Sequence, residues 1–342
     1  MKVLAGDIGG TKTLLAVAEV RLGASGEAGG KSAPQIEVLR SHRYDSRKHA
    51  GLGEICRAFA AELGAPLPRS AGFGIAGPVV NGRCQTTNLP WVIDARELGE
   101  SLGLSSVRMV NDFHALTLGI AALEPKQLAT LNQGTADPDG PWAVIGAGTG
   151  LGEAISILGA DGQRQVLASE GGHTDFAPRN ELEISLLRFL LKQHRHVSWE
   201  RLVSGEGLVN ICEALIELKG LTPPPAVADA LRGERGNAPA AISAAASSDP
   251  LCKEVVEVFA GLYGSEAGNL ALKTLPTGGV FLGGGIAPKL LPALKDGRFL
   301  EAFFDKGRMR PLLERMPVQV VLDDDTGLLG AACLAAQHRT KD

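Results

Sequence analysis

The chain has 342 residues, a net charge of −4 and a pI near 6.0. At roughly 100–200 residues per domain, this length predicts two domains. The acidic balance excludes the basic face of a nucleic-acid-binding protein, and an aromatic content of 4% argues against a base-stacking platform. Hydrophobic residues make up 44% of the chain, which is enough for a sizeable globular core.

Cysteines and apolar runs indicate where the protein resides. The five cysteines are scattered and none has C-x-x-C spacing, so we expect neither a zinc knuckle nor a redox pair. Such a set is typical of reduced thiols in a cytosol. The opening MKVLAGDIGG lacks the apolar stretch and cleavage site of a signal peptide, and no apolar run reaches roughly 18 residues. We therefore expect a cytoplasmic protein that has no membrane partner.

The first part of the chain is predicted to contain mostly strands. In residues 4–20, LAGDIGGTKTLLAVAEV, two apolar runs flank Gly9-Gly10, which predicts a strand, a tight turn and a second strand. Asp7 interrupts the first apolar run. The pattern then predicts a hairpin loop over 23–35, a strand over 35–45, a helix over 51–64, a buried strand over 70–80, and a strand over 106–123 that becomes a helix near Asp112.

The second part alternates strands with longer helices, which predicts an α/β fold. The predicted elements are a strand region over 141–158, helices over 180–193, 198–218 and 250–273, a strand, glycine loop and helix start over 278–291, and a strand, acidic turn and closing helix over 317–338. Residues 220–250 are rich in proline and alanine, and we interpret them as surface loops and short helices, not as a linker.

A weak internal repeat relates two glycine-rich turns. When the sequence is shifted by about 138 residues, GGTKTLLAVA (9–18) lies over AGTGLGEAIS (147–156), and Gly10-Thr11 matches Gly148-Thr149. Both segments predict a strand, a glycine turn and a strand. Two similar hairpins so far apart favour a duplicated domain with a site between its halves.

Neither turn is a familiar nucleotide motif. A P-loop needs Gly before its lysine, whereas Lys12 follows Thr11, and GAGTGLG (146–152) has the wrong glycine spacing for a dinucleotide fingerprint. Glycine turns still allow backbone N–H groups to approach phosphate oxygens, and threonine hydroxyls add donors. Two such hairpins could grip one polyphosphate, with Asp7 facing a hydrated Mg²⁺. Taken alone, a D-x-G-G-T segment is more often a plain β-turn than a phosphate site.

Taken in order, the motifs resemble those of bacterial-type glucokinases, in the sugar-kinase branch of the actin/hexokinase/heat-shock ATPase superfamily. The matching segments are GDIGGTKTLLAV, GIAGPVVNGRCQTTNLPW, VNDFHALTLGI, VIGAGTGLGEA, SEGGHTDFAPRNELE, HVSWERLVSGEGLVN, GGVFLGGGIAPK and DTGLLGAA. The resemblance implies a two-domain, ribonuclease H-like α/β fold with an active-site cleft between the domains. It implies a small domain of residues 1–122 plus 325–342, and a large domain of residues 123–324.

The resemblance also implies roles for particular residues. Asp112 would be the general base that takes the proton of the sugar 6-hydroxyl. The sugar ligands would be Asn88, Asn111, Asp112, Glu170, His173 and Glu200. The nucleotide would be held by Asp7, Gly9, Gly10, Thr11, Lys12, Gly148, Thr149, Gly150, Gly284 and Gly285, with Asp7 also binding Mg²⁺ through water.

Local sequence leaves simpler explanations open for several of these residues. Asp112 could be the N-cap of the helix that begins at Phe113, and His173 a satisfied turn histidine. Glu200 could be a solvated acid at a helix start, Asn88 an ordinary turn residue, and residues 283–285 a packing turn.

The function expected from the resemblance is ATP- and Mg²⁺-dependent phosphorylation of glucose to glucose 6-phosphate, the entry step of glycolysis, by a homodimer. A kinase of another hexose or amino sugar, a different phosphoryl donor, and an ATP-gated binding or assembly module remain alternatives. A sugar-responsive repressor is not favoured, because the phosphate hairpin begins at residue 4. ROK sugar kinases carry zinc-binding cysteines after E-G-G-H, but the next cysteine here is Cys212, so we expect no structural zinc.

Overall fold

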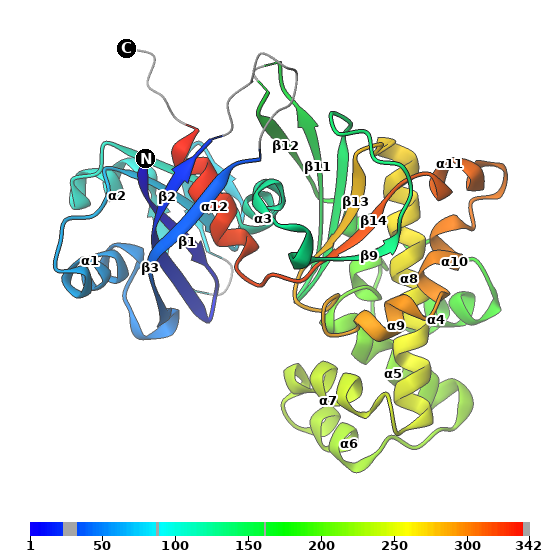
Figure 1. Cartoon of the computed structure of the whole chain (residues 1–342). Coiled ribbons are helices and arrows are strands. Elements are labelled where there is room, and N and C mark those ends of the chain that lie inside the picture. Colours follow the sequence, from blue (N-terminus) through cyan, green and yellow to red (C-terminus); the bar gives the residue numbers. More distant parts are fainter. Residues whose placement is uncertain (23–32, 87–88, 161, 338–342) are drawn as a thin grey trace. The chain divides into compact units, whose positions relative to one another are not determined.

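The structure is a computed structural model and describes residues 1–22, 33–86, 89–160 and 162–337 (Figure 1). The chain divides into two compact units. The first unit comprises Met1–Gln127, Ser156–Leu167 and Asp323–Asp342, and the second comprises Leu128–Ile155 and Ala168–Leu322. The predicted hairpin loop over 23–35 lies mostly outside the described residues, and so does Asn88.

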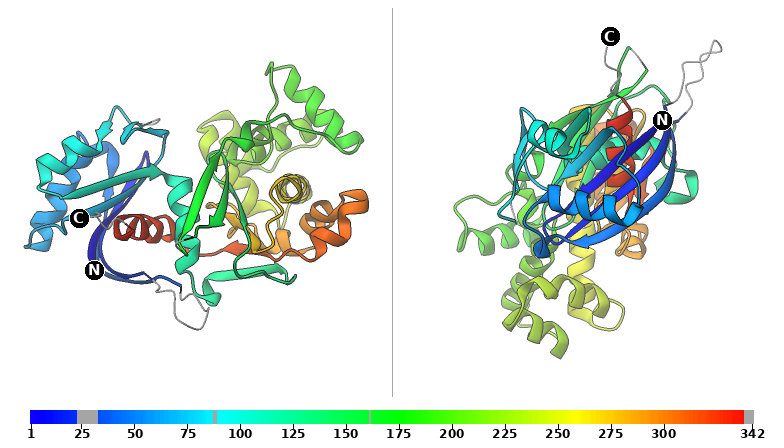
Figure 2. Two further views of the ribbon diagram at one scale, coloured as in Figure 1. Left: turned by 90° about the horizontal axis from the view of Figure 1, so that it is seen from above. Right: turned by 90° about the vertical axis from the view of Figure 1, so that its left-hand side faces the viewer.

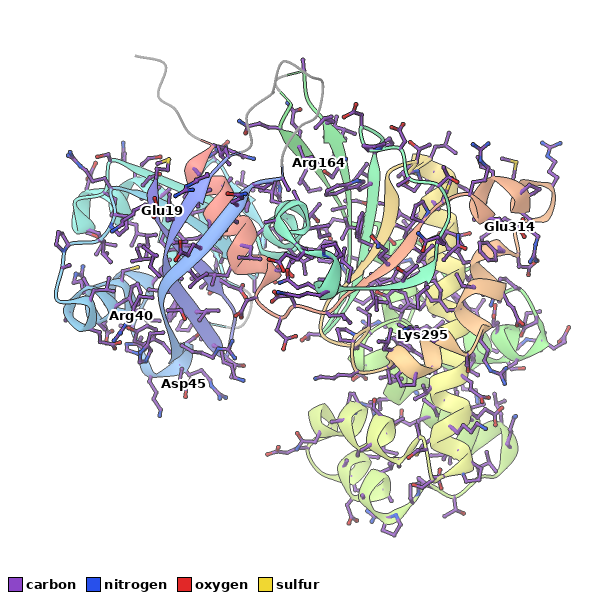
Figure 3. The ribbon with its side chains drawn as sticks, viewed as in Figure 1. Glu19, Arg40, Asp45, Arg164, Lys295 and Glu314 are labelled. Atoms are coloured by element: carbon purple, nitrogen blue, oxygen red, sulfur yellow. The ribbon has the colours of Figure 1, made fainter. Side chains whose placement is uncertain are left out.

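The first unit contains a mixed five-stranded sheet in the order β3-β2-β1-β4-β8. Its strands are β1 (Lys2–Ile8), β2 (Lys12–Arg21), β3 (Gln35–Asp45), β4 (Ser70–Ile75) and β8 (Ser106–Asn111). Strands β1, β4 and β8 run parallel, whereas β2 and β3 are antiparallel neighbours of β1 and β2. The outer strand β3 is exposed along most of its length and carries charged side chains such as Arg40 (Figure 3), which disfavour pairing with a further strand.

The alternation of side chains along β1 determines which face each residue joins. Leu4 and Ile8 pack into the core that contains helix α1 (Leu52–Leu63), and the neighbouring α2 (Ala95–Leu102) adds Leu98 to the same core. Val3 and Ala5 pack on the other face against α12 (Thr326–Ala336), the red helix beside the blue strands in Figures 1 and 2. Asp7 has the same parity as Val3 and Ala5, so it faces α12.

The first unit also includes α3 (Asp112–Gly119), which packs against α12, and a small three-stranded sheet. The strands of that sheet are β5 (Val79–Val80), β6 (Arg83–Gln85) and β7 (Val92–Asp94).

A six-stranded sheet in the order β12-β11-β10-β13-β14-β9 belongs mostly to the second unit, although the end of β11 and most of β12 fall within Ser156–Leu167 of the first. Its strands are β9 (Leu128–Asn132), β10 (Trp142–Ala147), β11 (Leu151–Leu158), β12 (Arg164–Ser169), β13 (Gly279–Gly283) and β14 (Val318–Val321). Strands β10, β13 and β14 are parallel and almost wholly buried, as expected of a sheet covered on both faces.

Long helices supply most of the core of the second unit. They are α4 (Glu181–Leu191), α5 (Gly205–Lys219), α6 (Pro225–Arg232), α7 (Ala238–Ala245), α8 (Pro250–Thr274), α9 (Leu291–Lys295), α10 (Arg298–Phe304) and α11 (Arg310–Glu314). The buried Tyr263 ties α8, seen end on in the left view of Figure 2, to β10 by donating its hydroxyl hydrogen to the Ile145 carbonyl at 3.1 Å. In the described part of the chain, no helix is both long and apolar enough to cross a membrane.

Most predicted elements are confirmed, with two differences. The helix expected over 198–218 begins only at Gly205, because Ser204 caps it by accepting the Gly207 N–H, and residues 199–201 form a separate 3₁₀ turn. The glycine loop after β13 continues as turns through Leu290, and α9 begins at Leu291. The short helices predicted within 220–250 are α6 and α7, and they bury Val227, Ala238 and Ile242 in the core.

Candidate active site

The parallel strands of the first unit bring three predicted residues to one edge of its sheet. Ile8 at the end of β1 is in register with Ile75 of β4, and Ile75 is in register with Asn111 of β8. Asp7, Asn111 and Asp112 therefore lie at the carboxyl ends of neighbouring strands. This edge is where open α/β sheets usually bind ligands.

Asp7 lies among other acids at this edge. Burial, followed by the charges of Asp112 and Asp325, raises the pKa of Asp7 to about 6, and Arg43 opposes the rise. Arg43 contacts Asp325 at 3.4 Å. The carboxyl carbon of Asp7 lies 3.6 Å from where a methyl group on Gly327 would be, so Asp7 packs on the first turn of α12. Neighbouring carboxyl charges attract cations, although no group of three or more His, Cys, Asp or Glu side chains in the described residues is arranged to hold a metal ion directly. Sequence reasoning missed Asp325, although the acidic run before α12 was visible.

Asn111 and Asp112 occupy the turn between β8 and α3. Asn111 is the N-cap: its Oδ1 accepts the Phe113 N–H at 2.9 Å, and its Nδ2 donates to the Gly77 carbonyl at 3.2 Å. Asp112 is the first helical residue, and its Oδ1 also accepts from Phe113 N–H, at 2.8 Å. Burial raises the pKa of Asp112. The local sequence allowed Asp112 to be the N-cap of α3, but the N-cap in the structure is Asn111.

Gly9, Gly10, Thr11 and Lys12 form the turn between β1 and β2. The Gly9 N–H donates to the Lys12 carbonyl at 2.9 Å and closes the turn. The buried Ser46, which the sequence did not single out, holds it from outside: its N–H donates to the Thr11 carbonyl at 3.0 Å, and its hydroxyl donates to the Gly9 carbonyl at 2.9 Å. The backbone of this turn is therefore fixed.

The second glycine turn joins β10 and β11 and lies beside the glycine loop after β13. The Gly148 N–H donates to the Gly150 carbonyl at 2.8 Å, and Thr149 is exposed between them. Gly284 has φ +78°, and a methyl group on it would lie 2.5 Å from the Ala147 carbonyl oxygen, so only glycine is accommodated there. A methyl group on Gly285 would meet no atom within 4 Å.

The three predicted sugar ligands of the second unit form one cluster. His173 lies between two carboxylates, with Nε2 at 3.8 Å from Glu170 Oε2 and Nδ1 at 3.8 Å from Glu200 Oε1. The Leu151 N–H donates to Glu200 Oε2 at 3.0 Å, and a methyl group on Gly150 would overlap with that oxygen. The second glycine turn and the sugar cluster are thus in direct contact. Glu170 and His173 are largely exposed, which leaves them free to bind a ligand.

Comparison with known proteins identifies the family. The glucokinase family model matches residues 4–338. A curated glucokinase of Nostoc sp. (strain PCC 7120) is 43% identical over 98% of this chain and 99% of its own. A glucokinase crystal structure from an Antarctic psychrotroph is 30% identical, with a TM-score of 0.84, over 98% of this chain and 99% of its own. The chain belongs to the glucokinase family.

A more distant structure supports the fold of this glucokinase family member. It is that of a ROK family glucokinase from Streptomyces griseus in complex with glucose and AMPPNP, which is 23% identical with a TM-score of 0.63 over 99% of this chain and 100% of its own. The expected α/β two-domain class of the actin/hexokinase type is therefore confirmed.

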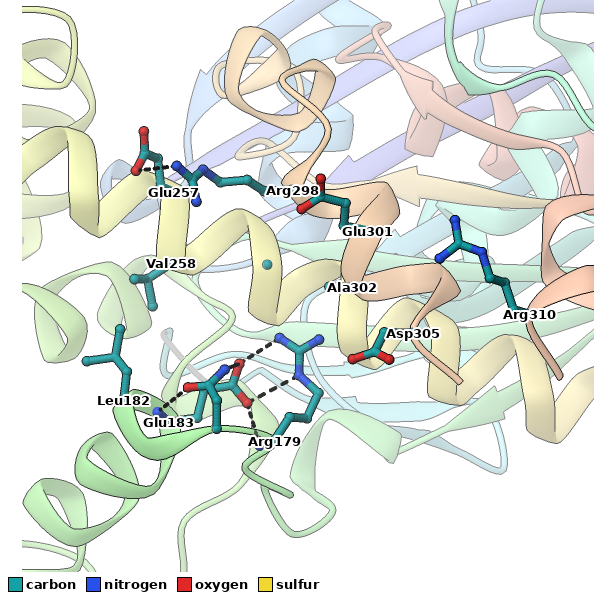
Figure 4. A pocket seen from close by; sticks show the side chains of 12 residues that line it. Arg179, Leu182, Glu183, Glu257, Val258, Arg298, Glu301, Ala302, Asp305 and Arg310 are labelled. Carbon is teal, nitrogen blue, oxygen red and sulfur yellow. Dashed lines mark hydrogen bonds and ion pairs between the residues drawn. The ribbon is translucent and has the colours of Figure 1, made fainter. Parts of the chain in front are cut away.

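One pocket in this glucokinase is separate from the predicted site residues. It has a volume of about 440 Å³, lies between α4, α8 and α10, and is lined by several charged side chains (Figure 4). Its arginines are already paired, Arg179 with Glu183 at 2.6 Å and Arg298 with Glu257 at 3.0 Å. The pocket contains none of the residues that the sequence predicted.

Proposed function

We propose that this glucokinase transfers the γ-phosphoryl group of ATP to the 6-hydroxyl of glucose, giving glucose 6-phosphate, with Asp112 as the general base. Members of the family have glucokinase activity, the phosphorylation of glucose. The observation that carries the choice of Asp112 is its place at the carboxyl edge of β8, next to the acid Asp7.

Phosphoryl transfer depends mainly on positioning and electrostatics, because the transferring group passes through a loose transition state. A carboxylate beside the acceptor hydroxyl takes its proton as the oxygen attacks. Burial raises the pKa of Asp112, which makes its carboxylate a stronger proton acceptor than an exposed aspartate. The hydrogen bond from Phe113 N–H to Oδ1 fixes the carboxyl orientation, so the base is preorganised.

The proposed glucose ligands are Asn111 and Asp112 in the first unit and Glu170, His173 and Glu200 in the second. Asn88, outside the described residues, completes the proposed set. Sugar hydroxyls are both donors and acceptors, so carboxylates, an amide and an imidazole are suitable partners. Each imidazole nitrogen of His173 has a carboxylate oxygen 3.8 Å away, which is close enough for charge attraction but beyond hydrogen-bond distance.

ATP would be bound by the two glycine–threonine turns and by Gly284-Gly285. The ROK glucokinase from Streptomyces griseus was solved with glucose and AMPPNP, an ATP analogue, which supports ATP as the donor. The residues around Asp7 suit Mg²⁺, because the ion needs few carboxylates and keeps several waters. Asp7 would hold it through water, and the ion would neutralise charge on the phosphates.

In the cell, we propose that the enzyme acts as a homodimer in the cytoplasm, at the entry to glycolysis. Its five cysteines are free and buried, which suits a reducing compartment. A homodimer is also the commonest oligomer of soluble enzymes. We further propose that the small domain is residues 1–122 plus 325–342 and the large domain residues 123–324.

The test is ADP release by the full-length enzyme with a panel of hexoses, and with ATP, ADP or polyphosphate as donor. We expect the highest kcat/KM with glucose and ATP, and dependence on Mg²⁺. Asp112→Ala should lower kcat by roughly 10²–10⁴-fold and leave the fold intact. The exposed Asp229→Asn is the matched control and should retain the wild-type rate. ATP hydrolysis that no sugar stimulates, or an Asp112→Ala variant with most of its sugar-dependent rate, would contradict the proposal.

A further inference from the structure

Two buried carboxyl groups of the second unit have no place in the reaction described so far. Glu153 of β11 is 3% exposed, and Glu266 of α8 is fully buried. Glutamates are rarely buried so completely unless they are paired with cations. The nearest cation, Lys273 Nζ, lies 3.8 Å from Glu266 Oε1 and is itself more than half exposed.

Glu153 lies directly behind the turn that carries two proposed sugar ligands. A methyl group on Gly171 would overlap with Glu153 Oε2 and with its carboxyl carbon. A methyl group on Gly172 would overlap with the Leu151 carbonyl, so the whole turn between Glu170 and His173 rests on β11. The Glu153 carboxyl therefore packs directly against the Gly171 backbone, because glycine places no side chain between them.

The two carboxyl groups share a buried site in which the charge of Glu266 acts on Glu153, and a proton shared between them would remove that repulsion. Burial and the charge of Glu266 raise the pKa of Glu153 to about 8, and burial also raises the pKa of Glu266. Glu266 Oε2 accepts from Asn269 at 2.8 Å, whereas Oε1 of each glutamate has no hydrogen-bond partner in the described part of the chain. A shared proton supplies the missing donor.

The charged and titratable groups around the pair come from three elements. Helix α8 contributes Lys273 and the buried Tyr263, whose pKa is raised mainly by burial and also by the Glu153 charge. Lys306, after α10, acts on Glu266, and burial lowers the pKa of Lys306 itself. The turn contributes the Gly171 backbone. Neither lysine lies within hydrogen-bond distance of Glu153 in the described structure, so neither neutralises a charge on it directly.

We propose that Glu153 and Glu266 are positioning residues for glucose binding, and that the singly protonated pair is the support that holds Glu170 and His173 in their binding geometry. This inference rests on the proposed function of those two ligands. With one proton, the carboxyls hold each other. When that proton is lost, the two buried carboxylates repel each other. The repulsion pushes the Glu153 carboxyl toward the Gly171 backbone. The turn is displaced and glucose binds more weakly.

The sign of the pH effect follows from the direction of the shift. A carboxyl whose pKa is raised in the folded protein stays protonated to higher pH, and the support is lost as pH rises through about 8. In the wild-type enzyme, KM for glucose should rise by up to about tenfold between about pH 7 and about pH 9, since each pH unit above the pKa changes the ratio of the two forms tenfold. The kcat at saturating glucose should change less than about twofold over this range, after correction for the pH dependence of a control variant.

Glu153→Gln is the decisive variant, because it keeps a hydrogen-bond donor toward Glu266 and cannot ionise. Its KM for glucose should stay near the wild-type value at about pH 7 and remain flat to about pH 9. Glu153→Ala, which removes the support, should raise KM at every pH. Glu254→Gln, on the same helix as Glu266 but paired with Lys219 near the surface, is the matched control and should follow the wild-type profile. A Glu153→Gln profile that rises like the wild type, or a flat wild-type profile, would overturn the proposal.

A second readout does not depend on catalysis. The His173 N–H donates to the Glu170 carbonyl at 3.0 Å, and the Thr174 N–H donates to the Gly171 carbonyl at 2.9 Å. Hydrogen exchange at these amides, corrected for intrinsic rates, should accelerate above about pH 8 in the wild type but not in Glu153→Gln. If glucose is not phosphorylated but this difference is seen, the proposed function fails and the support of the turn stands. If glucose is phosphorylated and the exchange is unchanged, the inference fails alone.

Discussion

The two glycine–threonine turns have similar sequences but different neighbours. The turn of residues 9–11 is held by Ser46 through backbone and hydroxyl hydrogen bonds, and the acid near it is Asp7. The turn of residues 148–150 contacts Glu200, whose carboxylate accepts the Leu151 N–H at 3.0 Å. The first turn is therefore linked to the proposed metal and base, and the second to the proposed sugar ligands.

This difference indicates how two similar glycine turns can serve two tasks. A glycine turn offers the same backbone donors in both places. The side chains packed against each turn therefore determine which substrates that turn affects. Changes at the first turn should affect ATP, Mg²⁺ and the chemical step. Changes at the second should affect ATP and glucose together, because one carboxylate touches both the turn and the sugar cluster.

Among substitutions that distinguish the roles of the two turns, a change at Asp7 should have the largest effect. Asp7→Asn should lower kcat by roughly 10²–10³-fold, because the proposed Mg²⁺ loses its charged anchor. KM for glucose should change little, because Asp7 lies near the first glycine turn and is not a proposed sugar ligand. Steady-state kinetics over a Mg²⁺ titration measure both quantities. Glu19→Gln, farther along the same hairpin, is the control, and a wild-type kcat in Asp7→Asn would contradict the assignment.

A smaller effect is expected at Glu200. Glu200→Ala removes a proposed sugar ligand and leaves the Leu151 N–H without its partner, so kcat/KM for glucose should fall by roughly 10–100-fold and KM for ATP should rise as well. Glu200→Gln keeps an acceptor for that N–H. This variant should therefore restore KM for ATP but not kcat/KM for glucose. If both constants respond identically in the two variants, Glu200 does not join the turn to the sugar cluster.

The third test compares the glycines of the two turns. A methyl group at Gly150 would overlap with the Glu200 carboxylate, whereas at Gly9 it would approach only the Lys12 carbonyl, at 3.0 Å. Gly150→Ala should therefore raise KM for both substrates by about tenfold, because small displacements of binding groups are costly. Gly9→Ala should raise KM for ATP alone, and by less. The surface Gly236→Ala, which meets no atom within 4 Å, is the control.

Sequence patterns predicted the parts of this molecule that depend on local chemistry. The glycine turns, the strand-to-helix change at Asp112 and most helix boundaries follow from apolar periodicity and glycine placement. The helix start at Gly205 was missed because the capping hydroxyl of Ser204 competes with the amphipathic pattern before it. The sequence left an N-cap at Asp112 open as an alternative, because Asn111 and Asp112 can both accept the Phe113 N–H.

Contacts between distant segments could not be predicted in the same way. Asp7 stood out as an acid in an apolar strand, and Glu153 in LGEAISIL gives the same signal. Its partner Glu266 lies on another element, and no local rule relates the two. The same holds for Ser46, which follows an edge strand and yet closes the first turn. These residues emerge only when the sheet register and helix packing are known.

Ser46 offers the smallest and most specific test of the comparison. Ser46→Ala removes the hydroxyl that bonds the Gly9 carbonyl and leaves the buried Thr13 hydroxyl without its 2.9 Å partner. Leaving a buried polar group unpaired costs about 1–3 kcal/mol, so Tm should fall by a few degrees. Because the first turn loosens and the second is untouched, KM for ATP should rise a few-fold while KM for glucose stays constant. Ser46→Thr keeps a hydroxyl and should recover part of the ATP affinity. An equal rise in both Michaelis constants would mean that the two turns do not act separately.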